Sequence, residues 1–144
     1  MKLLIVDDNR QLAHCIGKYF REKGHRSTSL CDSSKVLAWL GEHSCDAVVI
    51  DIRMPEIDGI ELTKLIRKEF TTLPILMLTG LGYDDDYIQS ATDAGANAYV
   101  SKVMGPSFIL MNLVRIVGTA VMTETGKKDE RKDPRAEIGL LSLS

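Results

Sequence analysis

Short apolar runs, each followed by a polar or charged residue, recur along this chain and constrain its fold more than any other feature. Residues 3–6, 47–50 and 74–78 are such runs, and residues 98–100 form a shorter one. Uninterrupted apolar runs of this length are typical of strands covered on both faces of a parallel sheet. Segments with the apolar spacing of amphipathic helices separate the runs. This alternation predicts an α/β protein in which helices flank a parallel sheet.

The connecting segments carry helix and strand signals of their own. Asn9 is placed to cap a first helix that Gly24 ends, and Ser33 or Ser34 is placed to cap a second. We expect a short second strand at residues 26–30, later helices at about residues 60–70 and 107–122, and a further helix that opens at residues 84–86 and stops at Gly95. With right-handed crossovers, the predicted fold is a three-layer, doubly wound (βα)5 sandwich of the flavodoxin-like kind, with a five-stranded parallel sheet.

The size and composition of the chain fit one soluble domain followed by a charged tail. With 144 residues, 44% of them hydrophobic and 26% charged, it is long enough for one core and too short for two ordinary domains. Residues 127–137 are almost entirely charged, so we expect a domain at residues 1–122 and a charged tail or linker at residues 123–144. A net charge of −2 gives no general attraction to nucleic acid, so direct DNA binding would need another domain.

The sequence offers no sign of export or of membrane insertion. Met1 and Lys2 lead directly into a strand, without an apolar stretch of signal-peptide length. No segment approaches the ~20 apolar residues of a membrane span. The three cysteines are odd in number and lack metal-type spacing, which favours reduced thiols. We therefore expect a cytoplasmic protein that does not contact a membrane.

Acidic and phosphate-binding side chains follow several of the predicted strands. Asp7 and Asp8 come after the first run, Asp51 comes after the run at 47–50, Thr79 follows the next, and Lys102 lies just past the last. Because ligands of such sheets bind beyond the carboxyl ends of the strands, these side chains should converge at one edge. Crowded carboxylates repel one another and raise one another's pKa unless a cation lies among them. Oxygen-only ligands suit a hard divalent ion, and magnesium (Mg²⁺) is the usual one.

This set of groups fits acyl-phosphate chemistry. A metal ion beside Asp51 would neutralise the oxygens of an incoming phosphoryl group and leave the carboxylate free to attack phosphorus in line. Lys102 would supply a second positive charge to the same oxygens. The hydroxyl of Thr79 can follow the phosphoryl group once it is in place. The sequence thus predicts that Asp51 accepts a phosphoryl group.

The ordered set of residues resembles the receiver domain of bacterial two-component response regulators, over roughly residues 1–122. The resemblance rests on the acidic pair, on Asp51, and on the turn after it, where Met54-Pro55 and Asp58-Gly59 match the family pattern. It implies a chemotaxis-type receiver fold and a signalling module that is controlled by phosphorylation. It also implies a sensor histidine kinase or a histidine phosphotransfer protein as donor, and a downstream effector or C-terminal output domain as target.

The same resemblance assigns roles to individual residues. It implies that Asp51 is the phospho-acceptor and binds Mg²⁺ together with Asp8, with Asp7 acting through water and with the backbone carbonyl of Arg53. The remaining family positions are Thr79 as switch hydroxyl, Tyr99 as switch aromatic and Lys102 as the phosphoryl-binding lysine. A receiver of this kind is not an enzyme in the usual sense, because it only phosphorylates itself from a donor and dephosphorylates itself.

One position departs from the family pattern. Receivers usually have a proline directly after the lysine, commonly with a cis peptide bond, whereas Val103 follows Lys102 and the first proline is Pro106. A cis bond before valine would cost roughly 2.5–4 kcal/mol, so we expect a trans bond. This change should reshape the loop between Lys102 and Pro106 and could move the lysine ammonium group.

Three other functions compete with the signalling receiver. An aspartyl-phosphate hydrolase would resemble Asp-x-Asp, but the second position is Arg53, which removes the acid/base group. A degenerate receiver that binds partners without phosphorylation is disfavoured because every chemical position is filled. A nucleotide-binding fold lacks support, since no G-x-G-x-x-G or Gly-Lys-Ser/Thr loop follows the first strand.

The last predicted helix is apolar around most of its circumference. One helical stripe that could cover the sheet consists of Ile109, Leu113, Ile116, Val117 and Ala120. Apolar residues that fall largely outside that stripe are Leu110, Met111, Val114 and Val121. Because an apolar outer face is usually covered, we expect a homodimer through this helix. The alternative is that apolar residues 138–141 of the tail fold back over it.

Overall fold

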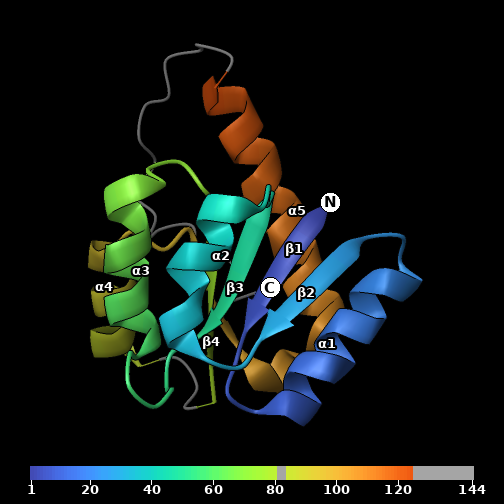
Figure 1. The fold of residues 1–144 in the computed structure, drawn as a ribbon, viewed down its shortest axis with the longest axis horizontal. Helices are drawn as coiled ribbons and strands as arrows, with labels where there is room; N and C mark the ends of the chain where they lie inside the picture. Colours follow the sequence, from blue (N-terminus) through green and yellow to red (C-terminus); the bar gives the residue numbers. More distant parts are fainter. Residues whose placement is uncertain (81–83, 125–144) are drawn as a thin grey trace.

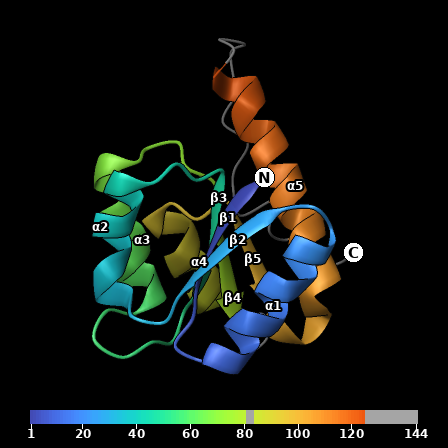
Figure 2. The same cartoon turned by 45° about the vertical axis from the view of Figure 1, so that its right-hand side comes forward.

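The computed structural model describes residues 1–80 and 84–124, with side chains as far as Ala120. Its five strands form one sheet in the order β2-β1-β3-β4-β5, and each neighbouring pair is parallel (Figures 1 and 2). The strands are β1 (Lys2–Val6), β2 (Arg26–Leu30), β3 (Ala47–Asp51), β4 (Ile75–Thr79) and β5 (Ala98–Ser101). This strand order is the flavodoxin-like, doubly wound one, so the predicted fold is confirmed.

Helices cover both faces of the sheet. They are α1 (Arg10–Glu22), α2 (Val36–Glu42), α3 (Gly59–Glu69), α4 (Asp85–Ala94) and α5 (Gly105–Glu124). Helices α1 and α5 pack on one face, and α2, α3 and α4 pack on the other (Figures 1 and 2). Alternate residues of each central strand point to opposite faces, so Leu4 joins the core beneath α2 and α3, whereas Leu3 joins the core beneath α1 and α5.

The helix starts follow capping chemistry, with one correction. The side chains of Asn9, Asp58 and Asp84 cap α1, α3 and α4. The second helical segment is not capped by Ser33 or Ser34, as the sequence pattern predicted. Instead the carboxylate of Asp32 accepts from the main-chain N–H of Ser34 at 3.0 Å and opens a 3₁₀ turn that leads into α2. The earlier aspartate supplies a stronger acceptor than either serine hydroxyl.

Helix α5 begins two residues earlier than predicted, because Pro106 is accommodated in its first turn, where no N–H partner is needed. Leu110 is 9% exposed, which corrects the prediction that it lies outside the buried stripe. Met111 and Val114 do face outwards, at 53% and 52% exposure. By length and composition alone residues 102–120 would also pass for a membrane span, contrary to prediction, although Leu113 and Ile116 pack into the core.

Candidate functional site

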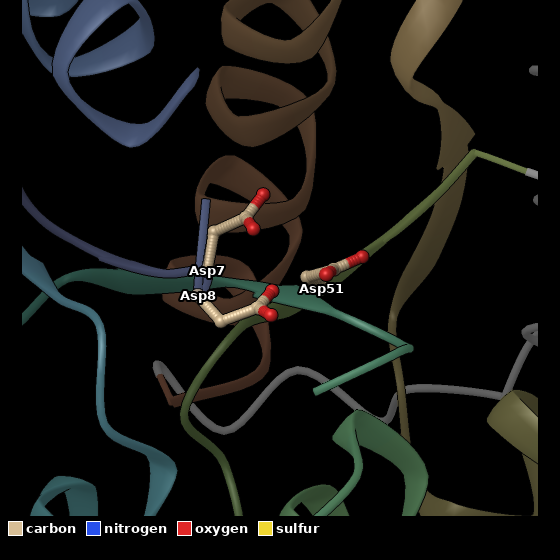
Figure 3. A group of neighbouring side chains, drawn as sticks. All are labelled: Asp7, Asp8 and Asp51. Carbon is tan, nitrogen blue, oxygen red and sulfur yellow. The ribbon is translucent and has the colours of Figure 1, made fainter. Parts of the chain in front are cut away.

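Three carboxylates gather at the carboxyl edge of the sheet. Strands β1 and β3 are neighbours, with Val6 paired to Ile50, so Asp7 and Asp8 emerge beside Asp51. Each of the three offers a carboxylate oxygen within 4.8 Å of the others, and Figure 3 shows the side chains lying together. Asp7 and Asp51 are buried, whereas Asp8 is exposed. Clustered oxygen donors of this kind, open to solvent at Asp8, suit a hard divalent cation such as Mg²⁺.

Lys102 lies between the two buried carboxylates. Its Nζ is 3.0 Å from Oδ2 of Asp7 and 3.1 Å from Oδ1 of Asp51. Burial alone would lower the pKa of Lys102, but the hydrogen bond to Asp7 and the charges of Asp51 and Asp7 raise it overall. The ammonium group therefore stays charged. The direct ion pair with Asp7 was not anticipated from the sequence, which assigned Asp7 to the metal through water.

Asp51 titrates far from its ordinary range. Burial raises its pKa most, the negative charge of Asp7 adds to the effect, and the attraction of Lys102 opposes it, with a resulting pKa of about 6. The charge of Asp8 contributes, least of these, to the same rise. The site therefore holds more negative charge than one lysine balances, which is the electrostatic condition for binding a second cation.

The two predicted switch residues lie on neighbouring strands. Thr79 ends β4, is 1% exposed, and pairs in register with Ser101 of β5. Tyr99 is fully buried in the core on the α4 side of the sheet, in the same cluster as Ile88 and Ala91. The structure thus places the Thr79 hydroxyl at the carboxyl edge of β4, next to the Asp51 strand, and the Tyr99 ring beneath α4 on β5, one strand further away.

A glycine sets the distance between the acceptor strand and helix α3. The main-chain N–H of Gly59 donates to the carbonyl oxygen of Ile52 at 2.7 Å. A Cβ atom at this position would collide with the main-chain oxygen of Asp51. The carboxylate of Asp58 caps the helix by accepting from Glu61 N at 2.8 Å. The Asp-Gly pair noted in the sequence is therefore explained by packing, because only glycine allows α3 to start against the Asp51 backbone.

A groove of about 440 Å³ opens beside the carboxylates. Asp8, Arg53, Met54 and Pro55 line it together with Tyr87 of α4. Nη2 of Arg53 lies 3.4 Å from the hydroxyl of Tyr87. The sequence singled out Arg53 for its backbone carbonyl only. Tyr87 was missed, because its helical position carries no motif that distinguishes it from a core aromatic residue.

The loop after Lys102 takes the form expected from its missing proline. The described residues contain no cis peptide bond, so the predicted trans bond before Val103 is confirmed. Residues 102–104 make a 3₁₀ turn, and the Val103 side chain is 85% exposed. The ammonium group of Lys102 nevertheless reaches both carboxylates. The altered loop changes the outer surface without withdrawing the lysine from the site.

Comparison with known proteins identifies the class. The family model of the response regulator receiver domain matches residues 3–114. The regulatory protein VanRc of Enterococcus gallinarum is 32% identical over 105 residues, which are 73% of this chain and 45% of VanRc. A putative response regulator from Chloroflexus aurantiacus has a TM-score of 0.76 and 32% identity, and the match covers 81% of this chain and 97% of that one. The chain belongs to the response regulator receiver family.

This family consists of signalling domains rather than enzymes in the usual sense, and response regulators work with histidine kinases and output domains. The chain spans less than half the length of curated relatives such as VanRc and the transcriptional regulatory protein PhoP of Escherichia coli, where the match covers 45% of each. The matched region is therefore the receiver part of those longer proteins.

Proposed function

We propose that this domain accepts a phosphoryl group on Asp51, with the help of Mg²⁺, and thereby changes the surface that it offers to a partner. The observation that carries the proposal is the placement of Asp51, a buried carboxylate with a Lys102 ammonium group at 3.1 Å and two further carboxylates beside it. Its donor would be a sensor histidine kinase or a histidine phosphotransfer protein. We take residues 1–122 as the receiver unit and residues 123–144 as the tail, of which residues 125–144 lie outside the described residues.

The metal ligands in this proposal are Asp8 and Asp51 directly, Asp7 through water, and the backbone carbonyl of Arg53. When bound, Mg²⁺ supplies charge neutralisation for the phosphoryl oxygens. Asp8 is the exposed member of the cluster, which fits its role as the ligand that an ion meets first. Asp7 is already held by Lys102 and by the N–H of Asn9 at 2.9 Å, which fits an indirect role.

The groups of the chain itself divide the remaining tasks. Asp51 attacks phosphorus as the ionised carboxylate, and the bond from phosphorus to the donor's histidine nitrogen breaks as the new oxygen–phosphorus bond forms. Lys102 can turn from Asp51 towards a phosphoryl oxygen while it keeps its contact with Asp7. Thr79 donates its hydroxyl to another phosphoryl oxygen, and Tyr99 responds on the neighbouring strand. The structure gives no support to the hydrolase alternative, because the residue two positions after Asp51 is Arg53, which cannot serve as the acid/base group.

The output partner would be a downstream effector or a C-terminal output domain, and a homodimer through α5 is a further part of the proposal. Met111 and Val114 give α5 an exposed apolar face. We place the protein in the cytoplasm, where histidine kinases hold their donor domains, with no direct contact to nucleic acid or membrane. A degenerate receiver, which binds partners without phosphorylation, is the outcome if Asp51 takes no phosphoryl group.

Labelling with acetyl phosphate tests the proposal. We expect stoichiometric, Mg²⁺-dependent labelling of the wild-type chain, and none in Asp51→Asn, measured by intact-protein mass spectrometry. Circular dichroism of the variant checks that the fold is retained. Label that persists in Asp51→Asn at wild-type stoichiometry would exclude Asp51 as the acceptor, and a wild-type chain that stays unlabelled would favour the degenerate receiver.

A further inference from the structure

Helix α4 is held firmly at its C-terminal end. Arg67 of α3 donates from Nε to the carbonyl of Gly95 at 2.9 Å and from Nη1 to that of Phe70 at 2.9 Å. Its Nη2 donates to Oδ1 of Asn97 at 2.8 Å, and the same oxygen accepts from the N–H of Ile75 at 2.9 Å. One guanidinium group thus joins the ends of α3 and α4 to the starts of β4 and β5.

Close packing reinforces this C-terminal attachment. Gly95 caps α4 with φ of 107°, and a Cβ there would lie 2.8 Å from Cγ of Arg67. The Arg67 side chain is half-buried, and this burial lowers its pKa to about 10. Its acceptors are the main-chain carbonyls of Gly95 and Phe70, at the ends of α4 and α3, and the amide oxygen of Asn97, just before β5. The attachment lies at the amino ends of the strands, because Ile75 is the first residue of β4. The phosphorylation site lies at the opposite, carboxyl ends.

The N-terminal end of α4 is held much more weakly. Within residues 1–80 and 84–120, the hydrogen bond that ties its first turn to another element is the one between Arg53 Nη2 and the Tyr87 hydroxyl. That bond is 3.4 Å long and exposed, beyond the usual N–H···O range. Ile88, at 8% exposure, is the first core residue of the helix. Arg53 follows the proposed acceptor by two residues and lines the same groove as Asp8.

We propose that the Arg53–Tyr87 contact is a releasable tether that couples phosphorylation of Asp51 to movement of the N-terminal end of α4, with the Arg67 attachment as the fixed end. The inference rests on the proposed function and deepens it. Phosphorylation replaces the single negative charge of the Asp51 carboxylate with about two on the phosphoryl oxygens, and Arg53 follows Asp51 by two residues. A guanidinium group can form two parallel bonds to a phosphoryl group of opposite charge, whereas the neutral phenol accepts one bond, so Arg53 turns towards the phosphoryl oxygens and leaves Tyr87.

The consequences differ along the helix. Once Arg53 leaves, the first turn of α4 keeps its cap at Asp84 and its apolar contacts within the described part of the chain, whereas the last turn keeps the bonds from Arg67 to Gly95 and Asn97. Opening of α4 should therefore be graded, greatest at residues 85–88 and least at residues 91–94. Arg53 and Tyr87 act here as positioning residues, since neither is required to make or break the bond to phosphorus.

Hydrogen exchange with beryllofluoride and Mg²⁺ as the phosphoryl mimic tests this inference. In the wild-type chain the mimic should raise exchange at residues 85–88 by about threefold, the loss expected for one weak hydrogen bond, and leave residues 91–94 unchanged. Tyr87→Phe keeps the ring but removes the hydroxyl. It should show the raised exchange at residues 85–88 before the mimic is added and little further change afterwards.

A matched variant and a separate binding readout complete the test. Arg67→Lys keeps the charge but loses the branched donor set, so it should raise exchange at residues 91–94 without the mimic. Fluorine NMR of bound beryllofluoride should be the same in Tyr87→Phe and the wild type. Absence of bound fluoride in the wild type would contradict the proposed function. If beryllofluoride binds, but exchange at residues 85–88 is the same in the wild type and Tyr87→Phe, with and without the mimic, the tether would be overturned and the proposed function would stand.

Discussion

At the scale of single residues, the main feature of the site is that three carboxylates share one ammonium group. Lys102 contacts Asp7 and Asp51 at 3.0 and 3.1 Å, yet the pKa of Asp51 is still raised to about 6. The lysine therefore offsets only part of the burial and repulsion. The unbalanced charge makes the site ready for a divalent ion and leaves the metal-free protein less stable than it would be with a neutral group at position 51.

The contribution of Asp51 to the stability of the metal-free protein should become less favourable as pH rises. The pKa of Asp51 is higher in the folded chain, about 6, than the ordinary value of 3.8, so the folded state binds the proton more tightly. Asp51 therefore opposes folding progressively between about pH 4 and pH 6, by roughly 2–3 kcal/mol once ionised. Urea denaturation of wild type and Asp51→Asn at pH 4 to 7 should give a difference that grows in this window. A constant difference would contradict the raised pKa, and Glu22→Gln, on the exposed surface, is the control.

Magnesium should stabilise the folded protein through Asp8. Because the ion binds the native carboxylate cluster, millimolar Mg²⁺ should raise the melting temperature by a few degrees. Asp8→Ala should abolish most of that gain, although it can raise metal-free stability by removing a like charge. Differential scanning fluorimetry with and without Mg²⁺ measures both effects. A full magnesium response in Asp8→Ala would show that Asp8 is not a direct ligand.

At the scale of elements, the contact between β3 and α3 fixes the geometry of the acceptor. Gly59 lies directly against the main-chain oxygen of Asp51 and bonds to Ile52 at 2.7 Å. Gly59→Ala should push α3 away from the strand end, destabilise the chain by about 1–3 kcal/mol and slow labelling of Asp51. Gly41→Ala, where an added Cβ meets nothing within 4 Å, is the matched control. Equal labelling rates in the two variants would mean that the close approach has no part in the site.

The exposed apolar face of α5 gives an element-scale test of self-association. Met111 and Val114 are more than half exposed on a helix whose opposite side fills the core. A dimer should form through this face, and Val114→Glu should break it because two glutamates would be buried near the two-fold axis. Light scattering of the wild type and Val114→Glu, with and without beryllofluoride, measures the molar mass and so tests whether the dimer forms. A chain that stays monomeric at high concentration in both states would remove the dimer from the account.

At the scale of the whole molecule, the sequence predicts the framework and the convergence of side chains well, for a physical reason. Buried parallel strands such as residues 47–50 must be continuously apolar, and the residue that ends each one must lie at the carboxyl edge. Asp51, Asp7 and Lys102 could therefore be brought together from their positions alone. The cap at Asp32 and the start of α5 were less well predicted, because helix ends depend on local competition among several acceptors.

Contacts between distant elements could not be predicted in this way. The bonds from Arg67 to Gly95 and Asn97 join residues 28 and 30 positions apart, and neither partner carries a motif. The same is true of Arg53 and Tyr87, which are 34 positions apart. Such pairs are fixed by how α3 and α4 pack on the sheet, and helical periodicity states only which side of a helix faces inwards. The structure is therefore needed to connect the site to α4.

The central claim is that Asp51 carries the phosphoryl group, and chemical trapping of the modified residue tests it most directly. Borohydride reduces an aspartyl phosphate to homoserine, so the label is converted into a stable change of side chain that peptide sequencing by tandem mass spectrometry can locate. After incubation with acetyl phosphate and Mg²⁺, the account predicts homoserine at position 51 and unmodified aspartate at positions 7 and 8. Homoserine at either of those positions, or aspartate at all three in a chain that intact-mass measurement shows to be labelled, would contradict it.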